Sequence, residues 1–146
     1  MAMATINPAT GETEFEAELH TPAEVETRIA LAQTAHETLR AMSYAERAAL
    51  MIKAADLIES EVEQTAVMLT REMGKPIAQS RGEVLKCAKS MRFYAEKAEE
   101  FLAPQVLADP SKVNASQAMA IWQPLGVVLA VMPWNYPLWQ VIRFAG

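Results

Sequence analysis

A continuous apolar run near the end of the chain restricts the possible folds more than any other feature. Val127 to Met132 is rich in β-branched residues, follows the turn Pro124-Leu125-Gly126 and is ended by Pro133. This pattern is typical of a strand buried on both faces of a parallel sheet. Such a strand needs helices on both faces and several partner strands. We therefore expect an α/β fold with a doubly wound, Rossmann-like parallel sheet, to which this chain contributes the first buried strand.

The middle of the chain, residues 21–103, is expected to form three amphipathic helices. Thr21-Pro22-Ala23-Glu24 and Ser43-Tyr44-Ala45-Glu46 each match a capping box, in which a hydroxyl and a glutamate satisfy the first backbone amides of a helix. We expect the second helix to continue to Gly74, because glycine readily adopts the left-handed conformation that ends helices. The third helix is expected from about Ile77 to Ala103, with Pro104 after it.

The other segments connect or extend this helical part. Residues 1–20 contain an Asn-Pro and a glycine with little periodicity, and we expect an extended N-terminal arm with a turn. Residues 104–126 are expected to form a linker and a strand at 115–123 whose alternation is imperfect. Residues 127–146 are expected to form the buried strand, a loop and the start of a helix from Pro137. Because only one buried parallel strand is present, we expect the chain to be the N-terminal part of a larger fold.

Composition excludes several classes of function. The 146 residues are 51% hydrophobic and 21% charged, which is typical of a globular protein. The net charge of −5 disfavours nucleic acid as a partner, because phosphate binding needs clustered lysine and arginine. Residues 1–10 show no secretory signal, and no apolar run is long enough to cross a membrane. The single cysteine, Cys87, excludes an internal disulfide and favours the cytoplasm.

The loop after the apolar run holds the candidate functional residues. Ligands bind doubly wound sheets at the carboxyl ends of the strands, where this loop is expected. Asn135 could donate hydrogen bonds to an oxyanion, and Trp134 could form a flat wall. If the helix begins near Asn135, then Trp139 and Arg143 share its face, and the guanidinium would suit a carboxylate. The structural alternative is a stiff turn in which Asn135 caps the helix, Trp134 is core and Arg143 lies on the surface.

Other chemically active residue types give no site. Cys87 lies within an apolar helical stretch, where it is expected to be a buried thiol with a raised pKa. His20 and His36 have no partners at the spacing of zinc ligands, so we expect no metal site. The sequence contains neither a G-x-G-x-x-G motif nor a phosphate-loop glycine pattern.

Several motifs together resemble the aldehyde dehydrogenase superfamily in order and separation. They are Asn7-Pro8-Ala9-Thr10-Gly11-Glu12, Glu72-Met73-Gly74-Lys75-Pro76, Tyr94-Ala95-Glu96, Pro124-Leu125-Gly126-Val127-Val128 and Met132-Pro133-Trp134-Asn135-Tyr136-Pro137. The last of these is the most specific. Residues 85–89 and 138–145 are similar to those of bacterial succinate-semialdehyde dehydrogenases.

The resemblance implies an NAD(P)-dependent oxidation of succinic semialdehyde to succinate through a thiohemiacetal and a thioester. It implies that Asn135 stabilises the oxyanion and that Met132, Pro133, Trp134 and Asn135 line the cofactor cleft. Arg143, beside Trp139, would meet the distal carboxylate of the substrate. NADP is the expected cofactor, with NAD possible in principle.

The resemblance also sets expectations about what this chain lacks. In the family, the nucleophilic cysteine and the general-base glutamate lie downstream of this sequence, and Cys87 does not match the catalytic position. We therefore expect residues 1–146 alone to be inactive. The full-length protein is expected to be a homo-oligomer, a dimer or tetramer, with the strand at 115–123 pairing between subunits.

Two alternatives stay open at this point. The parent enzyme could act on a different aldehyde. If the chain truly ends at Gly146, its helices could instead form a non-catalytic interaction module that presents an apolar face to a partner.

Overall fold

The computed structural model describes residues 3–146. Within this part of the chain, helices dominate and the strands are short. The elements are β1 (Met3–Ile6), β2 (Thr13–Ala17), α1 (Pro22–Ala41), α2 (Tyr44–Ser60), α3 (Val62–Met73), α4 (Ile77–Phe101), β3 (Gln105–Val106), the 3-10 turn η1 (Pro110–Val113), β4 (Met119–Ala120) and α5 (Pro137–Ala145).

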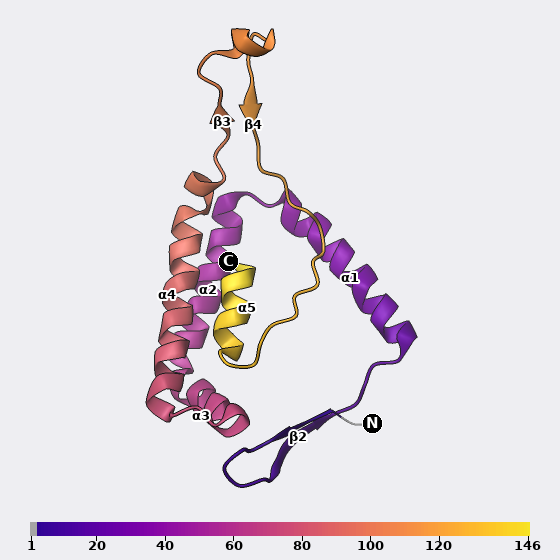
Figure 1. Cartoon of the computed structure of the whole chain (residues 1–146), viewed down its shortest axis with the longest axis vertical. Helices are drawn as coiled ribbons and strands as arrows, with labels where there is room; N and C mark the ends of the chain where they lie inside the picture. The colour runs from indigo at the N-terminus through magenta and orange to yellow at the C-terminus, as the bar shows by residue number, and fades with distance from the viewer. Residues whose placement is uncertain (1–2) are drawn as a thin grey trace.

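The described part of the N-terminal arm forms an antiparallel hairpin of β1 and β2 (Figure 1), while residues 1 and 2 of the expected arm lie outside the described residues. The turn contains the expected asparagine, and the side-chain oxygen of Asn7 accepts the amide of Ala9 at 2.9 Å. Glu14 in β2 pairs with Arg71 in α3, and the Arg71 Nε lies 3.0 Å from the carboxylate. This ion pair joins the hairpin to the helical part.

Both predicted capping boxes are confirmed. Glu24 Oε2 accepts the backbone amide of Thr21 at 2.7 Å, and Ser43 and Glu46 repeat the arrangement at the start of α2. Gly74 ends α3 with a φ of +74°, the left-handed conformation expected of it. The helix expected from Ile77 ends at Phe101, two residues earlier than predicted.

The prediction of three helices between residues 21 and 103 is wrong, because the structure has four there. The second predicted helix is interrupted at Glu61, between α2 and α3. The hydroxyl of Ser60 donates to the carbonyl of Leu57 at 2.8 Å, and such local bonds compete with helical ones and bend helices. The sequence has no glycine or proline at the break, and its hydrophobic periodicity continues through it. The sequence pattern therefore predicts one uninterrupted helix.

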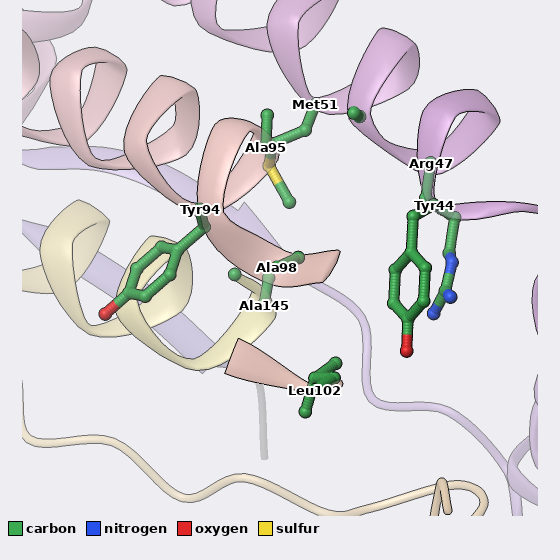
Figure 2. A pocket seen from close by; sticks show the side chains of 10 residues that line it. Tyr44, Arg47, Met51, Tyr94, Ala95, Ala98, Leu102 and Ala145 are labelled. Atoms are coloured by element: carbon green, nitrogen blue, oxygen red, sulfur yellow. The ribbon is translucent and has the colours of Figure 1, made fainter. Parts of the chain in front are cut away.

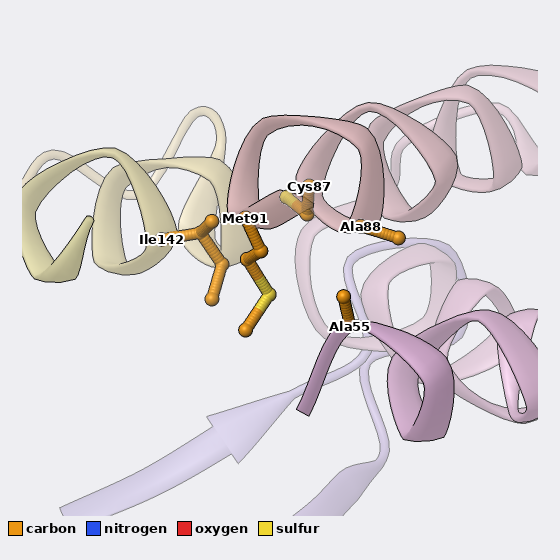
Figure 3. Packing of buried hydrophobic residues seen from close by; sticks show 5 residues of the cluster. All are labelled: Ala55, Cys87, Ala88, Met91 and Ile142. Carbon is orange, nitrogen blue, oxygen red and sulfur yellow. The ribbon is translucent and has the colours of Figure 1, made fainter. Parts of the chain in front are cut away.

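Helix α4 is the centre of the fold, because α2, α3 and α5 all pack against it. Figure 3 shows one buried cluster, in which α4 supplies three residues and α2 and α5 supply one each. Its members are Ala55, Cys87, Ala88, Met91 and Ile142. A second cluster joins α3 to α4 through Ala66, Leu69 and Val84. Val84, Cys87, Ala88 and Met91 thus form the buried face of α4.

Helix α1 differs from the others because it buries none of its residues. It runs apart from the α2–α4 pair in Figure 1, and Val25, Ile29 and Leu39, which form an apolar stripe along it, are exposed. Periodicity therefore identified the helix, but no described element covers the stripe.

The strand expectations in the last third of the chain need correction. The strand expected over residues 115–123 is reduced to β4, which pairs with β3 in a short hairpin that projects away from the helices (Figure 1). Val127 to Met132 forms no strand, and Leu129 and Val131 are 88% and 86% exposed. A strand requires a partner for its backbone groups, and the described chain offers this segment none.

Among residues 3–146, no helix combines the length and the apolar character needed to cross a bilayer.

Candidate functional site

The loop between Met132 and α5 exposes the candidate residues. Trp134 and Asn135 form a turn, and Trp134 is 55% exposed. The residue at the helix N-cap is Tyr136, and no side chain caps the helix. The structural alternative is therefore wrong for a core Trp134 and a capping Asn135, which are both exposed, but its surface position for Arg143 matches the structure.

The prediction that Asn135, Trp139 and Arg143 share one helix face is only partly correct. Helix α5 begins at Pro137, so Asn135 precedes it. Trp139 and Arg143 are four residues apart on α5, but their environments differ. Trp139 is half-buried and packs against the core cluster, with Lys86 Nζ 3.7 Å from its ring centroid, whereas Arg143 is exposed.

A buried ion pair that sequence reasoning missed lies beneath this loop. Lys75 and Glu83 are 5% and 3% exposed and pair with each other. Glu83 Oε1 also accepts the backbone amide of Trp139, in the first turn of α5, at 3.0 Å. The ammonium of Lys75 lies 3.5 Å from the ring centroid of Tyr136. Lys75 belonged to a recognised motif, but nothing in the sequence indicated that it meets Glu83 and α5.

Electrostatics exclude Cys87 as a nucleophile in this structure. Burial, together with a smaller contribution from the nearby Glu83 carboxylate, raises the pKa of its thiol to about 12. The reactive form of cysteine is the thiolate, which such a pKa suppresses at neutral pH. The expectation of an inert, buried thiol is confirmed.

Trp134 is the candidate residue that lines one of two pockets next to α5. Figure 2 shows an apolar pocket between α2 and the end of α4, where Arg47 lies over the ring of Tyr44 and Ala145 marks the end of α5. A second hollow, between α3 and α5, is lined by Trp134 and Glu72. Asn135 and Arg143 line neither of these two pockets, and both residues are exposed.

Comparison with known proteins identifies the family. The sequence model of the aldehyde dehydrogenase family matches residues 1–145. This chain belongs to the aldehyde dehydrogenase family. The resemblance read from the sequence motifs is thus confirmed, as is the assignment to the α/β fold of these enzymes.

Individual aldehyde dehydrogenases cover nearly all of the chain. An aldehyde dehydrogenase of Paenarthrobacter nicotinovorans is 50% identical over 145 residues, which are 99% of this chain and 32% of that protein. The NADP(+) succinate-semialdehyde dehydrogenase 1 of Mycobacterium tuberculosis is 52% identical over the same coverage. The chain thus spans about a third of the length of these relatives.

Solved structures share the arrangement of elements. The aldehyde dehydrogenase of Brucella melitensis biovar abortus has a TM-score of 0.89 and 31% identity, over 99% of this chain and 29% of that one. The succinic semialdehyde dehydrogenase of Streptococcus pyogenes, in complex with NADP+, has a TM-score of 0.87 and 31% identity, over 96% and 30%. These relatives are about three times longer than this chain, in which Val127–Met132 forms no strand.

Proposed function

We propose that residues 132–143 form one wall of the active site of an aldehyde dehydrogenase that oxidises succinic semialdehyde to succinate. The observation that carries this proposal is the exposed Asn135 two residues before α5, with the exposed Arg143 on that short helix. An amide donor and a guanidinium are complementary to the two oxygen-bearing ends of a semialdehyde carboxylate. The names of the relatives support this choice of substrate.

In the proposed reaction, Asn135 donates a hydrogen bond to the aldehyde oxygen. This bond strengthens as negative charge develops on that oxygen, so it lowers the barrier more than it tightens substrate binding. Arg143 binds the carboxylate at the other end and orients the substrate. Trp139 stiffens the helix between them, because its ring packs on the core while its amide is held by Glu83.

The cofactor-binding role proposed for residues 132–135 fits part of a dinucleotide. The exposed Trp134 indole and Asn135 amide suit the aromatic and amide groups of a dinucleotide. Its phosphates are anionic, and Arg143 is the only cationic side chain after Lys112. Recognition of the phosphates would therefore need residues beyond this stretch. NADP, when bound, would supply the hydride acceptor, and the names of the relatives favour it over NAD.

A chimaera tests this proposal. Residues 1–146 replace the matching segment of the Mycobacterium tuberculosis relative, and reduction of NADP is measured with succinic semialdehyde and with butanal, an uncharged aldehyde. We expect Asn135→Ala to lower kcat about 100-fold or more. Arg143→Ala should raise the KM for succinic semialdehyde roughly tenfold, without a matching change for butanal.

The exposed arginine Arg40 in α1 provides the matched control, and Arg40→Ala should change neither constant. An unchanged preference for succinic semialdehyde in Arg143→Ala would remove Arg143 from the substrate site. A chimaera that prefers butanal from the start would instead assign the chain to an enzyme for a different aldehyde.

We also propose that residues 1–146 have no dehydrogenase activity by themselves, because their one cysteine is the buried Cys87. Aldehyde-dependent reduction of NADP by the purified chain would contradict this.

The β3–β4 hairpin supports a proposed role in subunit association. Val106, Ile121 and Trp122 are each more than half exposed in or beside it, and its short strands leave open edges. An open apolar edge is a template for pairing with another chain. Ile121→Lys in the chimaera should reduce its mass in light scattering, and an unchanged mass would refute the role.

A further inference from the structure

In the reaction proposed above, neither Lys75 nor Glu83 contacts the substrate, and Glu83 enters it only through the Trp139 amide. Both side chains are buried, Lys75 in the segment between α3 and α4 and Glu83 in α4. A buried ion pair contributes little net stability, because the cost of desolvating two charges offsets most of their attraction. The contacts of this pair therefore point to a more specific role.

Those contacts hold the residues that follow Asn135. The Lys75 ammonium lies over the ring of Tyr136, the residue next to Asn135, at 3.5 Å from its centroid. Glu83 accepts the amide of Trp139 at 3.0 Å, where the first amides of a helix lack partners within the helix. Its negative charge also lies at the positive end of the α5 dipole.

Asn135 itself has no comparable support. It is exposed, it precedes α5, and its side chain does not cap the helix. The direction of its amide therefore depends on where the chain enters α5. That entry point is set by the contacts of Tyr136 and Trp139 with the buried pair.

We propose that Lys75 and Glu83 are positioning residues, which fix the start of α5 and thereby aim the Asn135 amide at the aldehyde oxygen. This inference rests on the proposed role of Asn135. Hydrogen-bond donors in an active site must be placed accurately, because a displacement of about 1 Å can reduce the rate about 100-fold.

Two double variants that differ in one group test the inference. Lys75→Met/Glu83→Leu replaces the pair by apolar side chains, a change that proteins often tolerate without loss of stability. Lys75→Met/Glu83→Gln also removes both charges, but retains an oxygen that can accept the Trp139 amide. Arg81→Gln/Glu63→Gln is the control, because it removes an exposed ion pair between α4 and α3 that does not involve α5.

The first measurement uses the 146-residue chain and needs no activity. Urea unfolding should give similar stability for the two Lys75 double variants. Hydrogen exchange at the Trp139 amide should be roughly tenfold or more faster in the leucine variant than in the glutamine variant, because only the former lacks the acceptor. Equal exchange in both variants would overturn the inference.

The second measurement uses the chimaera. The leucine variant should lose at least about tenfold in kcat with little change in KM, and the glutamine variant should recover much of that loss. Equal kcat in both variants and in the Arg81 control would overturn the positioning role. The proposed role of Asn135 is tested separately by Asn135→Ala. An unchanged kcat in that variant would overturn both the role of Asn135 and its positioning by the buried pair. The exchange data would still show whether the pair holds the start of α5.

Discussion

The chemical inertness of Cys87 provides the sharpest test of the packing described above. Its side chain is fully buried between α2, α4 and α5, and burial raises the pKa of its thiol from 9.0 to about 12. At about pH 8 the thiolate fraction falls from about one in ten to about one in ten thousand. Alkylation of the folded chain should therefore be slower by roughly a thousandfold, before restricted access slows it further.

The assay is the rate of iodoacetamide labelling, followed by mass spectrometry, in buffer and in denaturing urea. A Ser111→Cys variant carries an exposed cysteine in the η1 turn and serves as the matched control, because its second thiol should react quickly in the folded state. Labelling of Cys87 in buffer at the rate seen in urea would refute the buried position.

The same raised pKa predicts how stability depends on pH. The protonated thiol is favoured in the folded state, so its contribution is complete below the ordinary pKa of 9.0 and is lost as the pH rises toward about 12. Urea unfolding across this range should show a steeper loss for the natural chain than for Cys87→Ala. Parallel curves would contradict this assignment.

Three further predictions concern the helices and are all measured by urea unfolding. Met91→Ala should destabilise the chain by about 2–5 kcal/mol, because it leaves a cavity in the α2–α4–α5 cluster, and a loss below about 1 kcal/mol would mean that the cluster is loosely packed. Gly74→Ala should cost about 1–2 kcal/mol, because φ is +74° and an added Cβ would lie 2.9 Å from the Pro8 ring, and an unchanged midpoint would argue against this turn. Ser43→Ala should cost about 1 kcal/mol at neutral pH. The backbone amide and the hydroxyl of Ser43 both donate to Glu46 and lower its pKa, and Ser43→Ala removes only the hydroxyl, so part of this difference should be lost as the pH falls below 4.5; an unchanged midpoint at neutral pH would contradict the capping box.

Features that depend on a few neighbouring residues were predictable. The capping boxes at Thr21 and Ser43 and the left-handed Gly74 act within four residues, and the structure contains all three. The burial of Cys87 followed from the apolar residues one helical turn away. The family could also be recognised, because its motifs are contiguous stretches of sequence.

Features that depend on distant partners were not predictable. The break at Glu61 lies within an unbroken periodicity, and the bend there accompanies the packing of α2 and α3 on different parts of α4. Val127 to Met132 has the composition of a buried strand, yet strand formation depends on neighbouring strands, and residues 3–146 supply none for this segment. In the same way, the exposed stripe of α1 reveals which face is apolar but not what covers it.

The sequence by itself therefore determined the starts of α1 and α2, the end of α3 at Gly74, the inert thiol and the family, because each is expressed in local chemistry or in a contiguous motif. Only the tertiary structure decided how the loop with Asn135 is held. Glu83 meets Trp139 across 56 positions of sequence, and Lys75 reaches Tyr136 only because α4 and α5 pack together. Contacts over such distances depend on the packing of whole helices, which no local pattern records.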